Sequence, residues 1–381
     1  MNIILFAYYS CYPVIGGGSE VISNLTRVFK ERGHDVFIIT ERESLDIPRR
    51  GIIEGAEVLR CKFPVWSRHP ADVIKFLLFL PLTVIQLRKI LNKFQPDVIN
   101  VHVLCRYSVY PLFLSYLVKV PFIISIHGAD VIEYPNLSLL DLKVTQAWYK
   151  RAKFVTSCSQ WLLEKAKKVL PEIQNKSLTV ENGVNLQEFD QAKPFEHPRP
   201  FIFSLGRFIK RKGFDILIRA FRHTIDQIDG LDLIIAGDGL ERSRHEQLIE
   251  ELGMQNRVYL LGYTERTVTA SLFRGCEFFV LPSLWEPFGI VNLEAMASKK
   301  AIVATRVGGV LEFVRDGING IFVQPGNIEE LSRAIVHLYV NQDMREDMGS
   351  RGRKIVEERY SWEHIADNFL EVYQKVLHDT N

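Results

Sequence analysis

The chain has 381 residues, of which 47% are hydrophobic and 24% charged, and its formal net charge is +2 at pH 7. A chain of this length exceeds what one hydrophobic core usually supports, so two domains are expected. The near-neutral charge excludes a strongly basic, nucleic-acid-binding protein, and we predict no nucleic-acid partner.

The cysteines are odd in number, scattered, and lack Cys-x-x-Cys spacing, which argues against a disulfide framework or a zinc site and favours a reducing compartment. The start of the chain, Met1–Phe6, has no basic segment and is typical of a first strand rather than a signal peptide. We therefore expect a cytoplasmic protein. The five cysteines are Cys11, Cys61, Cys105, Cys158 and Cys276.

Short β-branched runs alternate with helical stretches, which predicts an α/β protein built on parallel sheets. Helices are expected at 20–31, 215–226, 290–297 and 328–339, the last opened by a capping box of Asn327 and Glu330. The predicted strands are 3–7, 36–40, 98–101, 122–126, 154–157, 201–205, 231–236, 258–261, 278–281, 301–305 and 320–323.

The pattern occurs twice, and each half opens with an apolar strand and a glycine-bearing loop. Between them, residues 189–200 contain three prolines and have the composition of a linker. We therefore predict one domain over 1–188 and a second over 199–360. A final helix over about 361–378 either packs on the second domain or crosses back to the first.

Gly16, Gly17 and Gly18 follow the first predicted strand and precede a helix. Their amides could contact a phosphate, although a plain tight turn explains them equally well.

The apolar segment 76–87 contains Pro81 and is too short for a membrane span. The ordinary interpretation is a buried or partly exposed helix. The more specific interpretation is a monotopic helix that lies on a membrane surface. Residues 1–185 carry 23 Lys and Arg against 16 Asp and Glu, whereas the remainder carries 24 against 29. The basic half could meet an anionic acceptor or the inner face of a membrane, but a chance excess of solvated lysines accounts for it too.

Ligands of doubly wound sheets bind at the carboxyl ends of strands, and several unusual residues fall there. His127 follows strand 122–126, where it could touch a reacting group or be structural. Arg207 and Lys212 follow strand 201–205 and could reach a diphosphate, or form a solvated basic turn. Gly237 follows strand 231–236 and permits close approach of a ligand.

The segment from Glu286 to Glu294 is the most informative. Its Pro-Phe-Gly turn leads into a predicted helix, so the amides of Phe288, Gly289 and Ile290 lie at a helix N-terminus that favours phosphate. A carboxylate stands at each end of the segment, on either side of this anion-binding position. That arrangement suits a sugar joined to a nucleotide diphosphate. Ordinary surface glutamates on a helix are the alternative.

The chain has no Asp-x-Asp and no His-x-x-x-His, so a metal site lacks its usual ligands and we predict none. Gly-x-Ser-x-Gly and the P-loop pattern are also missing, which argues against a serine hydrolase or a P-loop kinase.

Together these motifs resemble the retaining GT-B glycosyltransferases of family 4, also called group 1. Further matching motifs are His127-Gly128-Ala129-Asp130, Glu181-Asn182-Gly183-Val184 and Gly237-Asp238-Gly239. The resemblance implies two Rossmann-like, doubly wound domains facing across a cleft. The first domain would bind the acceptor and the second the nucleotide sugar, and the final helix would cross back to the first domain.

The resemblance also implies residue roles. Arg207 and Lys212 would hold the diphosphate, Glu294 the ribose, and Glu286 the sugar hydroxyls. The amides of 288–290 would assist, His127 would lie over the donor sugar, and the glycines at 17, 18 and 237 would border the donor. No cofactor is implied, because the nucleotide sugar, such as a UDP-sugar or GDP-mannose, is a substrate.

The implied reaction moves a hexose or N-acetylhexosamine to a hydroxyl of a glycan, a lipid-linked saccharide or a small molecule, with retention and without metal. A nucleotide-sugar epimerase of the same architecture and a non-catalytic nucleotide-sugar-binding protein remain as alternatives. The base, sugar, acceptor and oligomeric state are not evident from the sequence.

Overall fold

The computed structural model describes residues 1–7, 17–42, 44–67, 69–102, 108–132 and 134–379. The chain divides into two compact units. The first comprises Met1–Asn182 together with Trp362–Asn381, and the second comprises Gly183–Ser361. The first unit is therefore discontinuous in sequence, and its last helix is added from the end of the chain.

The first unit is built on an eight-stranded sheet of order β3-β4-β2-β1-β5-β6-β7-β8, in which only β3 runs antiparallel to its neighbour. Five of its strands match the predicted ones closely, whereas β3, the largely buried β4 and β8 were not predicted. The strands are β1 Asn2–Ala7, β2 Asp35–Glu41, β3 Arg50–Ile53, β4 Ala56–Cys61, β5 Val98–His102, β6 Phe122–Ile126, β7 Phe154–Ser157 and β8 Ser177–Thr179.

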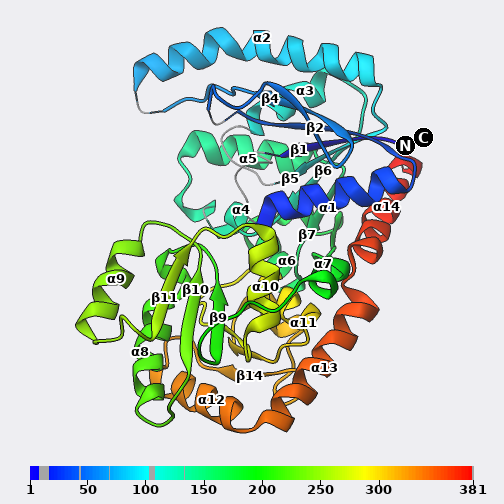
Figure 1. The fold of residues 1–381 in the computed structure, drawn as a ribbon. Coiled ribbons are helices and arrows are strands. Elements are labelled where there is room, and N and C mark those ends of the chain that lie inside the picture. The colour runs from blue at the N-terminus through cyan, green and yellow to red at the C-terminus, as the bar shows by residue number, and fades with distance from the viewer. Residues whose placement is uncertain (8–16, 43, 68, 103–107, 133, 380–381) are drawn as a thin grey trace. The chain divides into compact units, whose positions relative to one another are not determined.

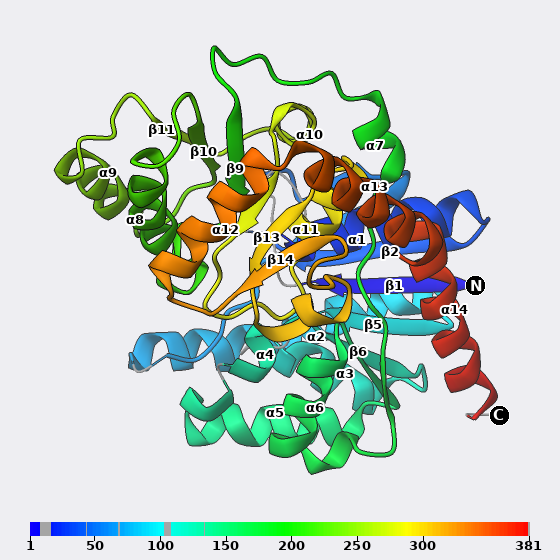
Figure 2. The same cartoon turned by 90° about the horizontal axis from the view of Figure 1, so that it is seen from below.

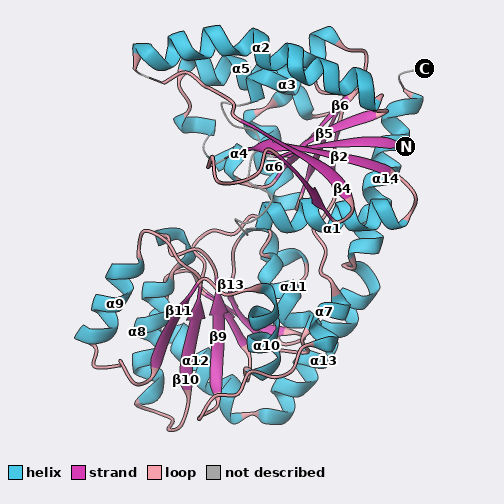
Figure 3. Ribbon diagram, turned by 45° about the horizontal axis from the view of Figure 1, so that its top comes forward, coloured by secondary structure: helices cyan, strands magenta, loops and turns pink. Residues whose placement is uncertain are grey.

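Helices cover both faces of this sheet (Figure 3). Helix α1 (Gly17–Glu31) lies on one face, where α14 (Trp362–His378) packs beside it. The opposite face carries a layer in which α2 packs on α3 and α3 packs on α5. These helices are α2 Pro70–Phe94, α3 Val109–Leu117, α5 Leu139–Arg151 and α6 Gln160–Val169, with a short α4, Ala129–Ile132.

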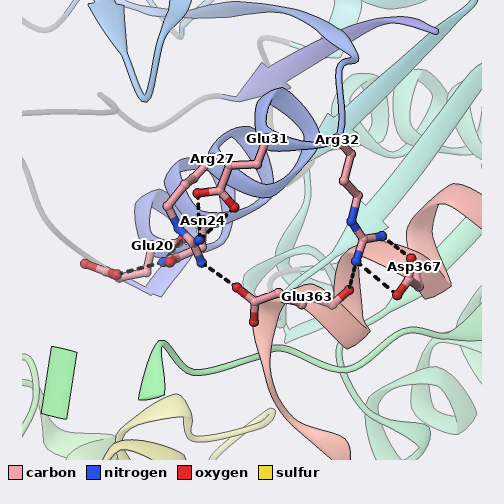
Figure 4. Close-up of polar contacts among 7 residues, drawn as sticks. All are labelled: Glu20, Asn24, Arg27, Glu31, Arg32, Glu363 and Asp367. Atoms are coloured by element: carbon pink, nitrogen blue, oxygen red, sulfur yellow. Dashed lines mark hydrogen bonds and ion pairs between the residues drawn. The ribbon is translucent and has the colours of Figure 1, made fainter. Parts of the chain in front are cut away.

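The closing helix α14 is held on the first unit by a buried polar contact and by exposed ion pairs. Asn100 Nδ2 of β5 donates to the Tyr373 hydroxyl of α14 at 2.7 Å. Figure 4 shows Arg27 of α1 paired with Glu363 and Arg32 paired with Asp367. Exposed ion pairs contribute little, so the buried apolar side of α14, including Trp362 and Phe369, supplies most of the stabilisation.

Helix α2 is longer than the apolar segment 76–87, and it is partly exposed, as the ordinary interpretation of that segment allows. The apolar run 76–87 is part of a 25-residue helix in which Pro81 is accommodated in the interior. By length and composition α2 is the one helix of the described residues that could cross a membrane. Only 17% of its apolar window is buried, so it is not a core helix of the unit. The prediction that the segment is too short was wrong, because His69 caps the helix well upstream of Phe76.

The second unit contains a six-stranded sheet, with all its paired strands parallel, of order β11-β10-β9-β12-β13-β14. Figure 2 shows it beside its helices. Its six strands agree with the predicted ones to within a residue at each end. They are β9 Phe201–Leu205, β10 Asp232–Ala236, β11 Val258–Gly262, β12 Phe279–Leu281, β13 Ile302–Thr305 and β14 Gly320–Val323.

The helices of the second unit also form two groups. Helices α8 and α12 pack together over one apolar cluster, which includes Phe221, Leu233 and Ile335, and α7, α10 and α11 pack together in the other group. The helices are α7 Leu186–Gln191, α8 Phe214–Ile225, α9 Arg242–Glu251, α10 Arg266–Gly275, α11 Ile290–Ala297, α12 Ile328–Val340 and α13 Gln342–Arg359. Asn327 caps α12 as predicted, but the Glu330 carboxylate accepts from Gln324 N instead of completing the capping box.

The predicted linker is part of the second unit. Phe189 of α7 is fully buried, and Asp190 forms an ion pair with Arg353 of α13. Phe195 N donates to Ser271 O of α10. The second unit thus begins at Gly183, a few residues before the end predicted for the first domain, because an apolar residue within a proline-rich segment anchors it.

Candidate active site

The order of strands in the second sheet reverses between β9 and β12, which pair through Phe203 and Phe279. At such a reversal the loops after the two strands diverge and leave a crevice at the carboxyl ends. The loop after β9 carries Arg207 and Lys212, and the loop after β12 carries Glu286. Topology alone therefore brings three predicted site residues to one place.

The structure joins two of these residues directly. Lys212 Nζ lies 2.5 Å from Glu286 Oε2, and Ser283 Oγ donates to the same oxygen at 3.1 Å. Both charged side chains are largely buried, with 16% exposure for Lys212 and 7% for Glu286. The ammonium has three protons and the carboxylate has a second oxygen, so each group retains capacity for a ligand.

Arg207 lies in the same loop but is exposed. The structure thus separates the two predicted cations: Lys212 is fixed in an ion pair, whereas the Arg207 side chain is on the surface.

Backbone contacts hold the loops together and require glycine at two positions. Gly308 has φ +60°, and a Cβ there would stand 1.7 Å from Glu286 O, while Gly309 N donates to that oxygen. Gly237 has φ +124°, and its Cβ would stand 1.9 Å from Gly206 O. Gly237 therefore allows close packing of the β9 and β10 loops, and the ligand approach predicted for it stays a prediction.

Helix α11 begins at Ile290, and Gly289 precedes it in the left-handed region with φ +90°. The first N–H groups of a helix have no acceptor within it and carry a partial positive charge. Phe288 is buried against Phe313 and Tyr360, which fixes the turn. The predicted strand–turn–helix arrangement is therefore present.

Glu294 lies one turn into α11, with 3% of its side chain exposed. Its Oε1 pairs with Arg266 Nη1, and Arg266 Nε lies 2.6 Å from Glu188 of α7. The other carboxylate oxygen of Glu294, Oε2, is buried and has no hydrogen-bond partner among the described residues. A buried acceptor left free in this way can receive a ligand hydroxyl.

In the first unit, His127 follows β6 and contacts a histidine that the sequence analysis did not single out. His127 Nε2 lies 3.0 Å from His102 Nδ1, at the end of β5, and the two rings stack. Asp130 accepts from the backbone N–H groups of His127 and Gly128 and so fixes the turn. Burial lowers the pKa of His127 to about 4, and burial together with His127 lowers the pKa of His102. Both imidazoles are neutral at pH 7.

The pair has a preferred tautomer. His102 Nε2 is buried and has no hydrogen-bond partner within the described part of the chain. A buried N–H without an acceptor costs more than a bare ring nitrogen, so the His102 proton is favoured on Nδ1. His102 then donates to His127 Nε2, and the His127 proton sits on Nδ1, where it can be donated.

Gly17 and Gly18 form the first turn of α1, and Gly17 is exposed. Gly16 lies outside the described residues. No group of three or more potential metal-ligating side chains occurs among the residues with described positions.

Two sequence-family models match nearly the whole chain in succession. Residues 15–188 match Glycosyltransferase Family 4, and residues 186–355 match Glycosyl transferases group 1. The chain belongs to the group 1 glycosyltransferases.

Relatives of this glycosyltransferase extend over nearly its full length. An uncharacterised glycosyltransferase of Methanocaldococcus jannaschii, MJ1607, is 28% identical over 95% of this chain and 96% of its own. N-acetyl-alpha-D-glucosaminyl L-malate synthase of Bacillus anthracis is 24% identical over 97% of each chain.

Among solved structures, sucrose-phosphate synthase of Thermosynechococcus elongatus matches with a TM-score of 0.82 at 21% identity, covering all of both chains. HepE of Anabaena, solved with UDP, matches with a TM-score of 0.78 at 20% identity, covering 98% of this chain and all of that one. These likenesses confirm the predicted fold class, two Rossmann-like α/β domains of the GT-B type.

Proposed function

We propose that this glycosyltransferase transfers a hexose or N-acetylhexosamine from a nucleotide-diphosphate sugar to a hydroxyl acceptor. The observation that carries the proposal is the pair of Lys212 and Glu286 at the strand reversal of the second sheet, beside the start of α11. A diphosphate needs fixed positive charge and N–H donors, and a sugar needs carboxylate acceptors. All of these groups belong to two neighbouring loops.

The donor is assigned to the second unit. Lys212 and Arg207 bind the diphosphate, the Glu294 oxygen without a partner accepts from a ribose hydroxyl, and Glu286 accepts from the donor sugar. Residues 288–290 present amides to the diphosphate or to the sugar. The relative HepE, solved with UDP-glucose, supports a nucleotide sugar as the class of donor.

The proposed chemistry follows from charge. As the bond between the anomeric carbon and the phosphate oxygen breaks, the diphosphate gains negative charge and the sugar gains oxocarbenium character. Cations and amides fixed beside the diphosphate lower the barrier because they need no rearrangement at that moment. In the first unit, His127 is neutral and can act as a hydrogen-bond donor.

We infer transfer with retention and without a metal ion. Glu286 is occupied by Lys212 and Ser283, which favours a hydroxyl-binding role over that of a nucleophile. On this proposal the leaving phosphate oxygen accepts the acceptor's proton on the face where the new bond forms. The acceptor, a glycan, lipid-linked saccharide or small molecule, is bound by the first unit.

The test begins with donor binding. Thermal unfolding is measured with UDP-glucose, UDP-N-acetylglucosamine and GDP-mannose, and a ligand at 100 times its Kd should stabilise the protein by about 2.7 kcal/mol. The donor found in this way is incubated with candidate acceptors, and NMR gives the anomeric configuration of the product. An inverted product refutes retention, and abolition of transfer by EDTA refutes metal independence.

Incubation with the donor alone distinguishes the earlier alternatives. Slow hydrolysis supports a transferase that lacks its acceptor, whereas an epimerised donor identifies an epimerase. Tight binding without turnover on any acceptor would indicate a binding protein.

A further inference from the structure

The outer side of α2 exposes a continuous apolar surface. Its largest exposures are 64% for Leu78, 62% for Leu82 and 61% for Leu77. We call the set the outer stripe; it consists of Ile74, Leu77, Leu78, Phe79, Leu82 and Ile85. Scattered exposed apolar residues are normal, but six on one helix form a surface that requires an explanation.

The opposite side of α2 is firmly packed on the first unit. Phe76, Val84, Leu87 and Leu91 are buried at helical spacing. The Phe76 ring lies 5.0 Å from that of Trp66 and 6.4 Å from that of Tyr110 in α3. Figure 1 shows α2 along the outside of the helical layer, with α3 beneath it. The outer stripe is therefore the side that the domain leaves uncovered.

The charges on α2 are all of one sign beyond its first turn. From Val73 to Phe94 the helix carries no acidic residue, and Lys75, Arg88, Lys89 and Lys93 are exposed. Lys89 and Lys93 follow Leu82 by seven and eleven residues, which at 3.6 residues per turn places them within about 20° of its direction. The cations thus continue the line of the outer stripe towards the end of the helix.

A second basic surface lies along the same edge of the unit. Helices α2, α3 and α5 all end where the next strand begins, so their last turns share one edge of the sheet. A hollow there of about 600 Å³ is lined by Lys150, Arg151, Lys153, Lys176 and the exposed Tyr116, with no acidic residue. An apolar stripe that ends in cations, together with a basic hollow at the same edge of the unit, complements acyl chains and anionic headgroups.

We propose that α2 docks this glycosyltransferase on an anionic bilayer, lying in the plane of the interface. The outer stripe enters the boundary between headgroups and acyl chains, and Arg88, Lys89 and Lys93 contact lipid phosphates. The helix does not cross the bilayer, since crossing would pull Phe76 away from Trp66 and Tyr110. A second copy of the chain fits less well, because α2 offers no carboxylate beyond Asp72 to meet the cations.

The inference goes beyond the proposed function, which does not depend on it. Its test uses the full-length protein and sedimentation with phosphatidylcholine vesicles, either pure or containing 30 mol% phosphatidylglycerol, as ~30 mol% gives a strongly anionic surface. We expect binding to the anionic vesicles that weakens as salt is raised, and weak binding to the neutral ones. Equal or absent binding to both compositions would overturn the proposal.

Two pairs of variants isolate the apolar and the charged contributions. The double variant Leu78→Glu/Leu82→Glu should lower the partition coefficient by about tenfold or more, whereas Leu240→Glu, at a residue 95% exposed in the second unit, should not. Lys89→Glu/Lys93→Glu should abolish the preference for anionic lipid, and Lys354→Glu, at an exposed residue of α13, should retain it. Wild-type binding by either double variant would contradict the model.

A fluorescent reporter tests the orientation. Phe79→Trp should show a blue shift and quenching by lipids brominated near the headgroup. Quenching strongest at the bilayer centre would indicate a spanning helix and overturn the interfacial model. A concentration-dependent dimer that Leu78→Glu/Leu82→Glu dissociates, without any vesicle binding, would identify a second copy as the occupant instead. Donor binding, measured on every variant, separates these outcomes from failure of the transferase proposal.

Discussion

The Glu286 carboxylate receives Lys212 Nζ and Ser283 Oγ on one oxygen, so its negative charge is compensated before a ligand binds. A buried ion pair contributes little net stability, but removal of one partner leaves the other charged in a poorly solvated place. Any variant of this pair therefore changes folding and ligand binding together. A matched double substitution can separate the two.

We predict that Lys212→Met destabilises the protein by up to about 3–5 kcal/mol, the range seen when one partner of a buried pair is removed. Lys212→Met/Glu286→Gln should recover most of that loss, because a neutral amide then replaces the buried carboxylate. Both variants should transfer sugar at least ~10²-fold more slowly. Urea unfolding and donor-saturated rates measure the two effects, and recovery of activity in the double variant would refute the role of Lys212.

The stacked histidines give the first unit a pH-dependent stability. In the folded protein His127 has a pKa of about 4, whereas an unfolded histidine has a pKa near 6.5. Between these values the unfolded chain binds the proton and the folded protein does not, so stability decreases as the pH falls from 6.5 to 4. His102 acts in the same direction, because its pKa is lowered too.

We predict that acidification through this window costs at most about 3 kcal/mol for His127 alone, from the difference between its two pKa values. The variant His102→Gln/His127→Gln should have a flatter profile of unfolding free energy against pH. His223→Gln, on an exposed part of α8, serves as the control and should keep the wild-type slope. An unchanged slope in the double variant would contradict the buried neutral pair.

At the scale of elements, the turn into α11 depends on a contact from the loop after β13. Gly308 and Gly309 in that loop close on the backbone of Glu286. The position of the Glu286 side chain is thus set from two strands, β12 and β13.

We predict that Gly308→Ala costs roughly 3 kcal/mol or more, since it combines left-handed strain with a collision against Glu286 O. Gly317→Ala is a matched control: Gly317 has φ +72°, but its Cβ would meet no atom within 4 Å. It should cost only the strain, about 1–2 kcal/mol. Thermal unfolding compares the two variants, and equal losses would show that the collision is relieved by movement of the loop.

The burial of most strands explains whether the sequence predicted them. Strands such as Phe122–Ile126 are buried on both faces, so a nearly continuous apolar run marks them. By contrast, β3 (Arg50–Ile53) and β8 (Ser177–Thr179) are short, partly exposed edge strands without such a run. The length of α2 could not be predicted from periodicity, because apolar residues on both its buried and its exposed side remove the helical pattern.

The same contrast applies to the candidate site. Glu286, Glu294 and Lys212 were evident because glycines, a turn and a helix start surround them in sequence. Arg266 and Ser283 had no such signal, since each matters only through a contact formed in the folded unit. His102 left a weak trace: it and Asn100 are polar residues in an otherwise apolar strand.

At the scale of the whole molecule, the two units differ in how much of the chain each needs. The second unit is a continuous segment, whereas the first includes α14. Without that helix the first unit would expose its contacts with Phe369 and Tyr373 and leave Asn100 Nδ2 without its acceptor.

We predict that residues 183–361 expressed alone fold cooperatively and bind the donor, while residues 1–182 alone aggregate or form a loosely packed state. Circular dichroism melting and calorimetry with the donor measure this. A cooperative transition of residues 1–182 at the temperature of the full protein would show that α14 is dispensable. Failure of residues 183–361 to fold would show that the units depend on each other.

Because translation proceeds from the N-terminus, the ribosome delivers α14, which completes the first unit, only after residues 183–361. Residues 183–361 can therefore fold first. During that time the nascent β1–β8 sheet lacks α14, which covers part of one face. A stop codon anywhere near Trp362 would therefore damage the beginning of the protein more than its end. The first unit must therefore avoid aggregation while the whole second unit is synthesised.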